Sequence, residues 1–111
     1  VKRGARFLVI VVNDGWFGNS SEPYQHAALA RFRAVEHRIP VVRCANTGIS
    51  AVYEPTGFMT ARLPVNGHGV LLANISPVQS GTFYTRFGDL FALVAMGLFL
   101  VMGVWFWHRE R

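Results

Sequence analysis

The feature that most constrains this chain is an uncharged run of eighteen residues near its C-terminal end, from Leu90 to Trp107. As a helix rising about 1.5 Å per residue, the run would reach about 27 Å, close to the roughly 30 Å hydrocarbon core of a bilayer. Aromatic residues gather at both ends, as they do at membrane interfaces: Phe83, Tyr84, Phe87 and Phe91 around its start, and Trp105, Phe106 and Trp107 at its close. A buried helix of a soluble protein is the alternative, but the run is apolar on every face, which favours a transmembrane helix.

The charges beside the run predict its orientation. Arg86 and Asp89 precede it, whereas Arg109 and Arg111 follow it, with Glu110 between them. Because cytoplasmic flanks carry an excess of basic residues, we expect the C-terminus to face the cytoplasm and residues 1–89 to lie on the other side of the membrane. The sequence therefore predicts a water-facing domain (residues 1–81), a juxtamembrane linker (82–89), a transmembrane helix (90–107) and a cytoplasmic tail (108–111).

Composition narrows the classes of partner. The net charge of +5 comes from eleven lysines and arginines against six acids, but the basic residues are scattered along the chain. Without a basic block we predict no nucleic-acid binding, and an anionic membrane surface is the better match. Cys44 is the only cysteine, and the histidines have no ligand spacing, so we predict no metal and no cofactor. The start at Val1, which is not an initiator methionine, favours a piece of a longer protein.

Ahead of the apolar run, the residue pattern predicts alternating strands and a helix. Six apolar residues, Phe7 to Val12, are typical of a central strand covered on both faces. A helix should begin near Glu22 and Pro23, capped by Ser20 or Ser21, and run to about His37 before Pro40. Its apolar face is marked by Ala28, Leu29, Phe32 and Val35.

Further strands follow the helix, separated by glycine-containing turns. Their expected ranges are Val41 to Ala45, Ile49 to Tyr53, a shorter strand at Phe58 to Leu63, and Gly69 to Ile75. This order predicts an α/β or α+β layer arrangement and not a helical bundle. So few strands with one helix leave open edges and an uncovered face, and we expect the segment to be unstable alone.

Several motifs resemble the C-terminal part of the apolipoprotein N-acyltransferase family, a branch of the nitrilase, or carbon-nitrogen hydrolase, superfamily. They are Val11-Val-Asn-Asp-Gly-Trp-Phe-Gly-Asn19, Tyr24-Gln-His-Ala27, Arg31-Phe-Arg-Ala-Val-Glu36, Val42-Arg-Cys-Ala-Asn-Thr-Gly-Ile-Ser50 and Tyr84-Thr-Arg-Phe-Gly-Asp89. The last one, directly ahead of an apolar run, distinguishes the acyltransferases from soluble amidases. The resemblance implies the C-terminal portion of an α-β-β-α nitrilase-type sandwich followed by one transmembrane helix.

The resemblance also implies a reaction and a location. An acyl chain would move from a phospholipid donor to a cysteine thioester, and then to the N-terminal amine of a lipidated apolipoprotein acceptor. The family's catalytic glutamate, lysine and cysteine would all lie upstream of Val1, so this chain is expected to carry no catalytic residue and to be inactive alone. The complete protein would be a multi-pass protein of the bacterial inner membrane, with residues 1–89 in the periplasm.

Trp16, Phe17 and Asn13 are the candidate binding residues. Two large aromatics on a glycine-flanked loop either plug a gap in the core or line a pocket, and the resemblance favours a pocket that contacts acyl chains. The amide of Asn13 could orient a catalytic group or hold the turn.

Other reactive side chains are better explained structurally. Cys44 lies in a strand-like run, where a thiol usually packs as a small hydrophobe, and the side chain of Arg43 should point to the opposite face. Glu36 should pair with Arg33 three residues earlier, and His26 should lie on the helix surface.

Two other functional readings remain open. One is a membrane-anchored amidase or nitrilase-type hydrolase, which would release an acid and an amine or ammonia. The other is a non-catalytic module that holds a lipid or a lipoprotein terminus in the loop from Asn13 to Asn19. A nucleophile on the strand that precedes Phe7 to Val12 would exclude the non-catalytic module. The absence of further membrane spans would favour the hydrolase over the acyltransferase.

Overall fold

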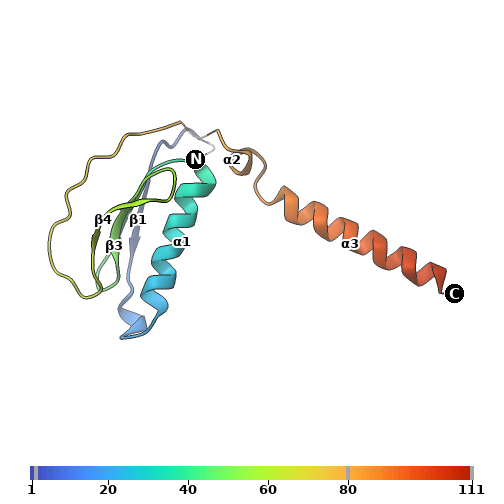
Figure 1. Ribbon diagram of the computed structural model, residues 1–111, viewed down its shortest axis with the longest axis horizontal. Coiled ribbons are helices and arrows are strands. Elements are labelled where there is room, and N and C mark those ends of the chain that lie inside the picture. The colour runs from blue at the N-terminus through green and yellow to red at the C-terminus, as the bar shows by residue number, and fades with distance from the viewer. Residues whose placement is uncertain (2, 80, 111) are drawn as a thin grey trace.

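A computed structural model describes residues 1, 3–79 and 81–110 and consists of a small α/β domain with a long helix projecting from it (Figure 1). Lys2 and Arg111, which enter the charge arguments above, lie outside the described residues. The elements are β1 (Leu8–Val12), η1 (Gly15–Phe17), α1 (Glu22–His37), β2 (Val41–Ala45), β3 (Ser50–Tyr53), β4 (Met59–Leu63), α2 (Phe83–Phe87) and α3 (Leu90–Arg109). The predicted helix and four of the predicted strands are thus confirmed, with each boundary within one residue.

The four strands form one mixed sheet in the order β1-β2-β3-β4. β1 and β2 are parallel, with Leu8 opposite Val41, and α1 makes the crossover between them. β3 and β4 follow as antiparallel neighbours joined by short turns. A parallel pair joined through a helix confirms the predicted mixed α/β class.

One face of the sheet is covered by α1, and alanines make the contact. Ala27, Ala30 and Ala34 recur at helical spacing and are almost fully buried. They pack against buried residues of the sheet and the turn before β3, namely Val41, Ile49, Ala51 and Tyr53. The Tyr53 hydroxyl donates a hydrogen bond of 3.1 Å to the carbonyl of Ala27, so the small helix side chains let backbone and sheet approach closely.

The large apolar residues of α1 lie elsewhere, which corrects the predicted face. Leu29, Phe32 and Val35 are 56%, 59% and 40% exposed and take no part in the buried core. The alanines have the same helical period as the large apolar residues, so the period alone does not decide which set packs on the sheet. The small side chains of the alanines suit a close contact between helix and sheet.

The sheet face opposite α1, here called the open face, carries Val9, Val11, Val42 and Cys44. Val9 lies opposite Val42, and Val11 opposite Cys44, so all four point to one side. Val9 and Val11 are 59% and 77% exposed. The prediction that the first strand is central and covered on both faces is therefore wrong for the described residues, because β1 is an edge strand with one bare face.

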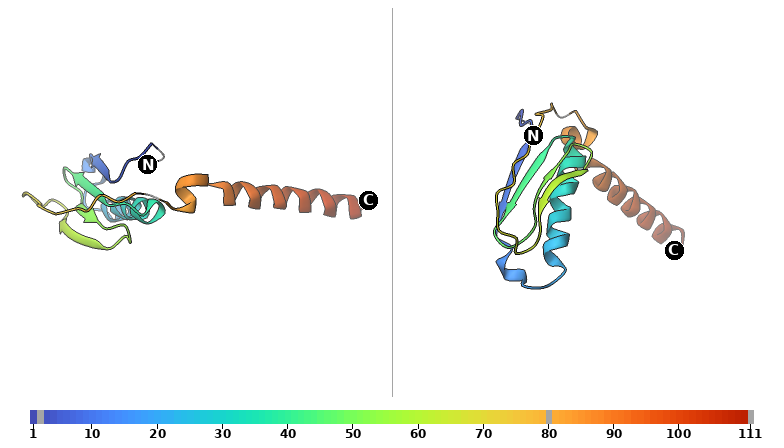
Figure 2. Two further views of the ribbon diagram at one scale, coloured as in Figure 1. Left: turned by 90° about the horizontal axis from the view of Figure 1, so that it is seen from above. Right: turned by 60° about the vertical axis from the view of Figure 1, so that its left-hand side comes forward.

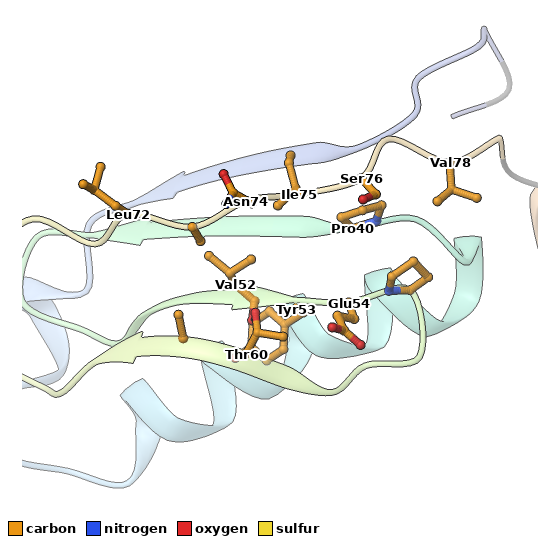
Figure 3. Close-up of a pocket in the computed structure, with 13 residues that line it drawn as sticks. Pro40, Val52, Tyr53, Glu54, Thr60, Leu72, Asn74, Ile75, Ser76 and Val78 are labelled. Atoms are coloured by element: carbon orange, nitrogen blue, oxygen red, sulfur yellow. The ribbon is translucent and has the colours of Figure 1, made fainter.

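The predicted strand Gly69 to Ile75 is also wrong for the described residues. This segment runs beside the sheet without regular structure, and Figure 3 shows Leu72, Asn74 and Ile75 on it above a cavity of about 520 Å³. A strand needs a neighbour that completes its hydrogen bonds, and the described sheet pairs only β1, β2, β3 and β4 with one another. Extended residues with no ladder partner do not form a strand.

The predicted linker contains a short helix, α2, that docks on the C-terminal end of α1. The Thr82 hydroxyl donates a hydrogen bond to the carbonyl of Glu36 and accepts one from the amide of Thr85. His37 Nδ1 lies 2.9 Å from the Thr85 hydroxyl. One threonine thus caps both the last turn of α1 and the first turn of α2.

α3 begins at Leu90, as the sequence predicts, and extends to Arg109. It is 20 residues long, and its most apolar stretch of 18 residues has a mean hydropathy of 2.3 and is not buried against the rest of the chain. Among the described residues it is the one helix long and apolar enough to cross a membrane.

Candidate functional site

The candidate site lies where β1 and β2 end. Parallel strands bring their carboxyl ends to the same edge of a sheet, and two loops meet there. The first loop runs from Asn13 to Asn19 after β1, and the second is Asn46-Thr47-Gly48 after β2. In Figure 1 this edge lies at the opposite end of α1 from α2.

The side chains of Asn13 and Asn46 join the two loops. Nδ2 of Asn46 donates to Oδ1 of Asn13 over 2.7 Å, and Oδ1 of Asn46 accepts from the amide of Asp14 over 3.0 Å. The Asn13 oxygen also accepts from the amide of Gly15 over 3.0 Å. Of the two roles open to Asn13, the described contacts are those of a residue that holds the turn.

Behind these loops lies a buried ion pair. The carboxylate of Asp14 and the guanidinium of Arg43 are each about 2% exposed and approach to 2.6 Å. Nε of Arg43 also donates to the carbonyl of Ile49 over 3.1 Å. Burying two charges is favourable only when each is paired and hydrogen-bonded, and this pair meets that condition. It fastens the first loop to β2.

His26 completes the polar cluster from the side of α1. Its Nδ1 lies 2.7 Å from Oδ1 of Asp14, and because a carboxylate only accepts, the ring nitrogen donates. The ring also meets Phe17 edge to face, with the centroids 5.7 Å apart. Asp14 is therefore held by two side chains from different elements, His26 of α1 and Arg43 of β2.

Gly48 makes room for the Asp14 carboxylate. A Cβ atom at position 48 would come within 1.8 Å of Oδ2 and 2.6 Å of Cγ of Asp14. Since no real contact is that short, only glycine fits at this point of the second loop. The sequence feature read as a plain turn signal is thus also a packing requirement.

The two predicted aromatics differ in their surroundings. Phe17 is partly covered by His26, whereas Trp16 is 85% exposed. Beside them lies a small hollow of about 100 Å³, lined in part by Asp14, Gly18 and Thr47. The Trp16 indole protrudes from a loop that the buried ion pair holds in place. It can therefore offer an apolar contact to a molecule or protein segment outside this chain.

Other sequence predictions have mixed outcomes. The Arg33–Glu36 pair is confirmed at 3.1 Å, and Arg43 does point away from the side of Cys44. Cys44 does not pack as a buried hydrophobe, because it is exposed on the open face. His26 is not a plain surface residue, since its ring bonds to Asp14.

Sequence reasoning missed Asp14 and Arg43 altogether. One signal was available: Arg43 stands at the centre of the apolar strand β2, where a charge survives only with a partner. The partner, however, is 29 residues away, and no local pattern points to it.

The described side chains of the site hold the two loops together and leave Trp16 exposed. The only cysteine of the chain lies on the open face, and the Thr47 hydroxyl bonds to Asn46 of its own turn. Among the described residues, no three histidine, cysteine or acidic side chains gather as metal ligands would. A nucleophile with a base beside it, as acyl transfer requires, is not assembled within the part of the chain that the structure describes.

Known proteins resemble this chain in sequence. The sequence model of the carbon-nitrogen hydrolase family matches residues 1–84. An apolipoprotein N-acyltransferase of Geobacter metallireducens is 45% identical over 83% of this chain and 18% of its own length. That of Chlorobaculum tepidum is 42% identical over the whole chain and 21% of its own length, and that of Agrobacterium fabrum 48% over 73% and 15%. The chain spans about a fifth of the length of the curated relatives it matches.

Proposed function

The chain belongs to the carbon-nitrogen hydrolase family, and we propose that it forms the C-terminal part of a membrane-bound apolipoprotein N-acyltransferase. The observation that carries the proposal is the match to the Chlorobaculum tepidum acyltransferase, which covers the sheet domain and α3 alike. A soluble amidase would account for residues 1–84 but not for an apolar helix directly after them.

In the proposed reaction an acyl chain leaves a phospholipid, forms a thioester with a cysteine of the complete protein, and passes to the N-terminal amine of a lipidated apolipoprotein. The sulfur attacks the ester carbon and the lysophospholipid departs; the amine then attacks the thioester and the thiol is released. The glutamate base, the stabilising lysine and the cysteine belong to the part of the protein outside this chain.

Within this scheme the residues of the chain bind and position. Trp16 contacts the acyl chains, because it is the large aromatic that the first loop leaves exposed. Phe17 lies on the same loop beside His26, and Asn13 keeps the loop in place through Asn46. The Asp14–Arg43 pair anchors this loop to the sheet.

The proposed architecture is the C-terminal portion of an α-β-β-α sandwich, with residues 1–81 as part of the hydrolase domain. The open face supports it, because valines exposed on a sheet are covered in a sandwich by a second sheet. The segment from Gly69 to Ile75 would then find its pairing partner in that second sheet. Residues 82–89 lead to a transmembrane helix at 90–107 and a cytoplasmic tail at 108–111, with residues 1–89 in the periplasm of a multi-pass inner-membrane protein.

The test of the function compares the complete protein with this chain alone. Both are reconstituted in vesicles that contain a labelled phospholipid, and a diacylated lipopeptide with a free N-terminal amine is supplied as acceptor. We expect triacylated peptide only from the complete protein. Product from the chain alone would contradict the assignment of catalysis to the rest of the protein, and release of ammonia from simple amides without acyl transfer would favour the hydrolase.

Trp16→Ala in the complete protein tests the binding role. We expect the acyl-transfer rate to fall with the exposed aromatic removed, while Phe58→Ala, which removes an exposed aromatic between β3 and β4, leaves the rate unchanged. Equal effects of the two substitutions would remove Trp16 from the site.

The rate at which a reagent labels the Cys44 thiol tests the proposed sandwich. In this chain it is exposed, so a thiol reagent should label it readily. In the complete protein the second sheet should cover it and slow the labelling strongly. Equal labelling rates would contradict a sandwich built on the open face.

A further inference from the structure

We infer that the outer face of α1 rests on the surface of an anionic membrane. The outer face consists of Tyr24, Leu29, Phe32 and Val35, all exposed, with Phe32 opposite the buried alanines of α1 and the other three on either side of it. The inference rests on the proposed membrane location of α3, and goes beyond it by assigning a lipid contact to the α/β domain itself.

The outer face is apolar without being part of the core. Leu29, Phe32 and Val35 follow one another at spacings of three residues, which places them in one stripe. The sheet contact is made by Ala27, Ala30 and Ala34 on another side. A helix that packs on a sheet through one stripe and faces water with the rest should be polar there, whereas α1 exposes large apolar side chains alongside Gln25 and Glu36.

Arginines stand on both flanks of this stripe. At 100° per residue, Arg31 and Arg33 fall on opposite sides of the line through Leu29 and Phe32, and both are exposed. An apolar stripe bordered by arginines is the pattern of helices that lie in a membrane interface, where the basic heads meet anionic headgroups. Glu36, an acid that lies within the stripe, is paired with Arg33 at 3.1 Å.

The position of α1 next to the start of α3 gives the lipid contact its geometry. α2 docks on the last turn of α1 through the Thr82–Glu36 hydrogen bond and the His37–Thr85 contact. Only Gly88 and Asp89 separate the end of α2 from the start of α3. In Figures 1 and 2, α1 lies on the side of the sheet from which α3 departs, so a bilayer around α3 meets α1 before it meets the strands.

The test uses the complete protein in vesicles of phosphatidylcholine and phosphatidylglycerol. A photoreactive benzophenone amino acid replaces Phe32, which it resembles in shape, and the adducts formed on illumination are identified by mass spectrometry. A matched probe replaces Phe7, another exposed phenylalanine, which lies just before β1. We expect phospholipid adducts from position 32 and adducts within the protein from position 7.

Each other outcome overturns the inference. Adducts from position 32 to another part of the same polypeptide would mean that the outer face is an internal contact. Adducts to a second copy would make it a subunit interface. Acyl transfer measured in the same vesicles separates the two proposals: an active protein without lipid adducts at position 32 refutes the membrane contact alone, and lipid adducts in an inactive protein refute the activity alone.

The contribution of the arginines beside the stripe can be measured separately. Raising the phosphatidylglycerol content should increase the lipid adducts at position 32, and the double substitution Arg31→Gln and Arg33→Gln should abolish that increase while the domain stays folded. A matched double substitution of Arg3 and Arg62, exposed arginines outside α1, should leave the increase intact. If both pairs respond alike, the basic flanks of the stripe have no special role.

Discussion

The sheet face under α1 buries Val41, Ala51 and Tyr53 almost completely, whereas Val9 and Val11 on the open face remain mostly exposed. Both faces are built from similar β-branched strands, so composition does not separate them. The difference is that α1 covers one face only, with its small alanine side chains and with the Ala27 carbonyl that accepts the hydrogen bond from Tyr53. We therefore expect the α1 face to respond to single substitutions in this chain, and the open face only in the complete protein.

The largest expected effect breaks the buried ion pair behind the first loop. Arg43→Met leaves the Asp14 carboxylate buried without its closest partner, and should lower the free energy of unfolding by about 3 kcal/mol or more. Arg33→Met removes the exposed partner of Glu36 and should cost about 1 kcal/mol at most. Denaturant unfolding of the complete protein in detergent measures both, and similar losses from the two variants would contradict a stabilising role of the buried pair.

A steric change at the same point should cost somewhat less. Gly48→Ala forces a Cβ into the Asp14 carboxylate, and we expect a loss of about 1–3 kcal/mol as the loop shifts to relieve the overlap. Gly81→Ala adds the same methyl group where no atom lies within 4 Å, and should be nearly neutral. Thermal unfolding compares the two, and a neutral Gly48→Ala would mean that the two loops do not pack as closely as described.

A single hydrogen bond gives a smaller difference. Tyr53→Phe keeps the packed ring and removes the hydroxyl that bonds to Ala27, which should cost about 1 kcal/mol because the carbonyl is left without that donor. Tyr24→Phe removes an exposed hydroxyl on the same helix that Tyr53 contacts and should change stability little. Equal losses of stability from Tyr53→Phe and Tyr24→Phe would show that the bond from Tyr53 to Ala27 does not stabilise the packing of α1 on the sheet.

Local sequence signals predicted most of the fold. Strands β2 and β3 follow from short apolar runs between glycine turns, and α1 from the Ser21-Glu22-Pro23 start and an apolar period. The strand expected at Gly69 to Ile75 has the right composition but no neighbour among the described residues, because pairing is set by tertiary contacts and not by composition.

The candidate site was predicted only in part, for the same physical reason. Trp16 and Phe17 stand out because large aromatics are unusual in a glycine-flanked loop. Asp14 looks like an ordinary turn residue until the fold brings it to Arg43, and the side of α1 that packs is decided by how closely alanines approach the sheet.

The smallest expected effect concerns the junction between α1 and α2, and it depends on pH. Burial lowers the pKa of His37 below its usual 6.5, with nearby Glu36 opposing and Arg33 adding to the shift. The docked state therefore favours the neutral ring, which contacts the Thr85 hydroxyl at 2.9 Å. Docking should be complete above about pH 6.5 and weaken as the pH falls from there through the lowered pKa, since protonation then favours the undocked state. Hydrogen-exchange protection of the α2 amides, corrected for the intrinsic rate, measures this in the complete protein; His37→Gln should flatten the pH profile, and an unchanged profile would assign it to another group.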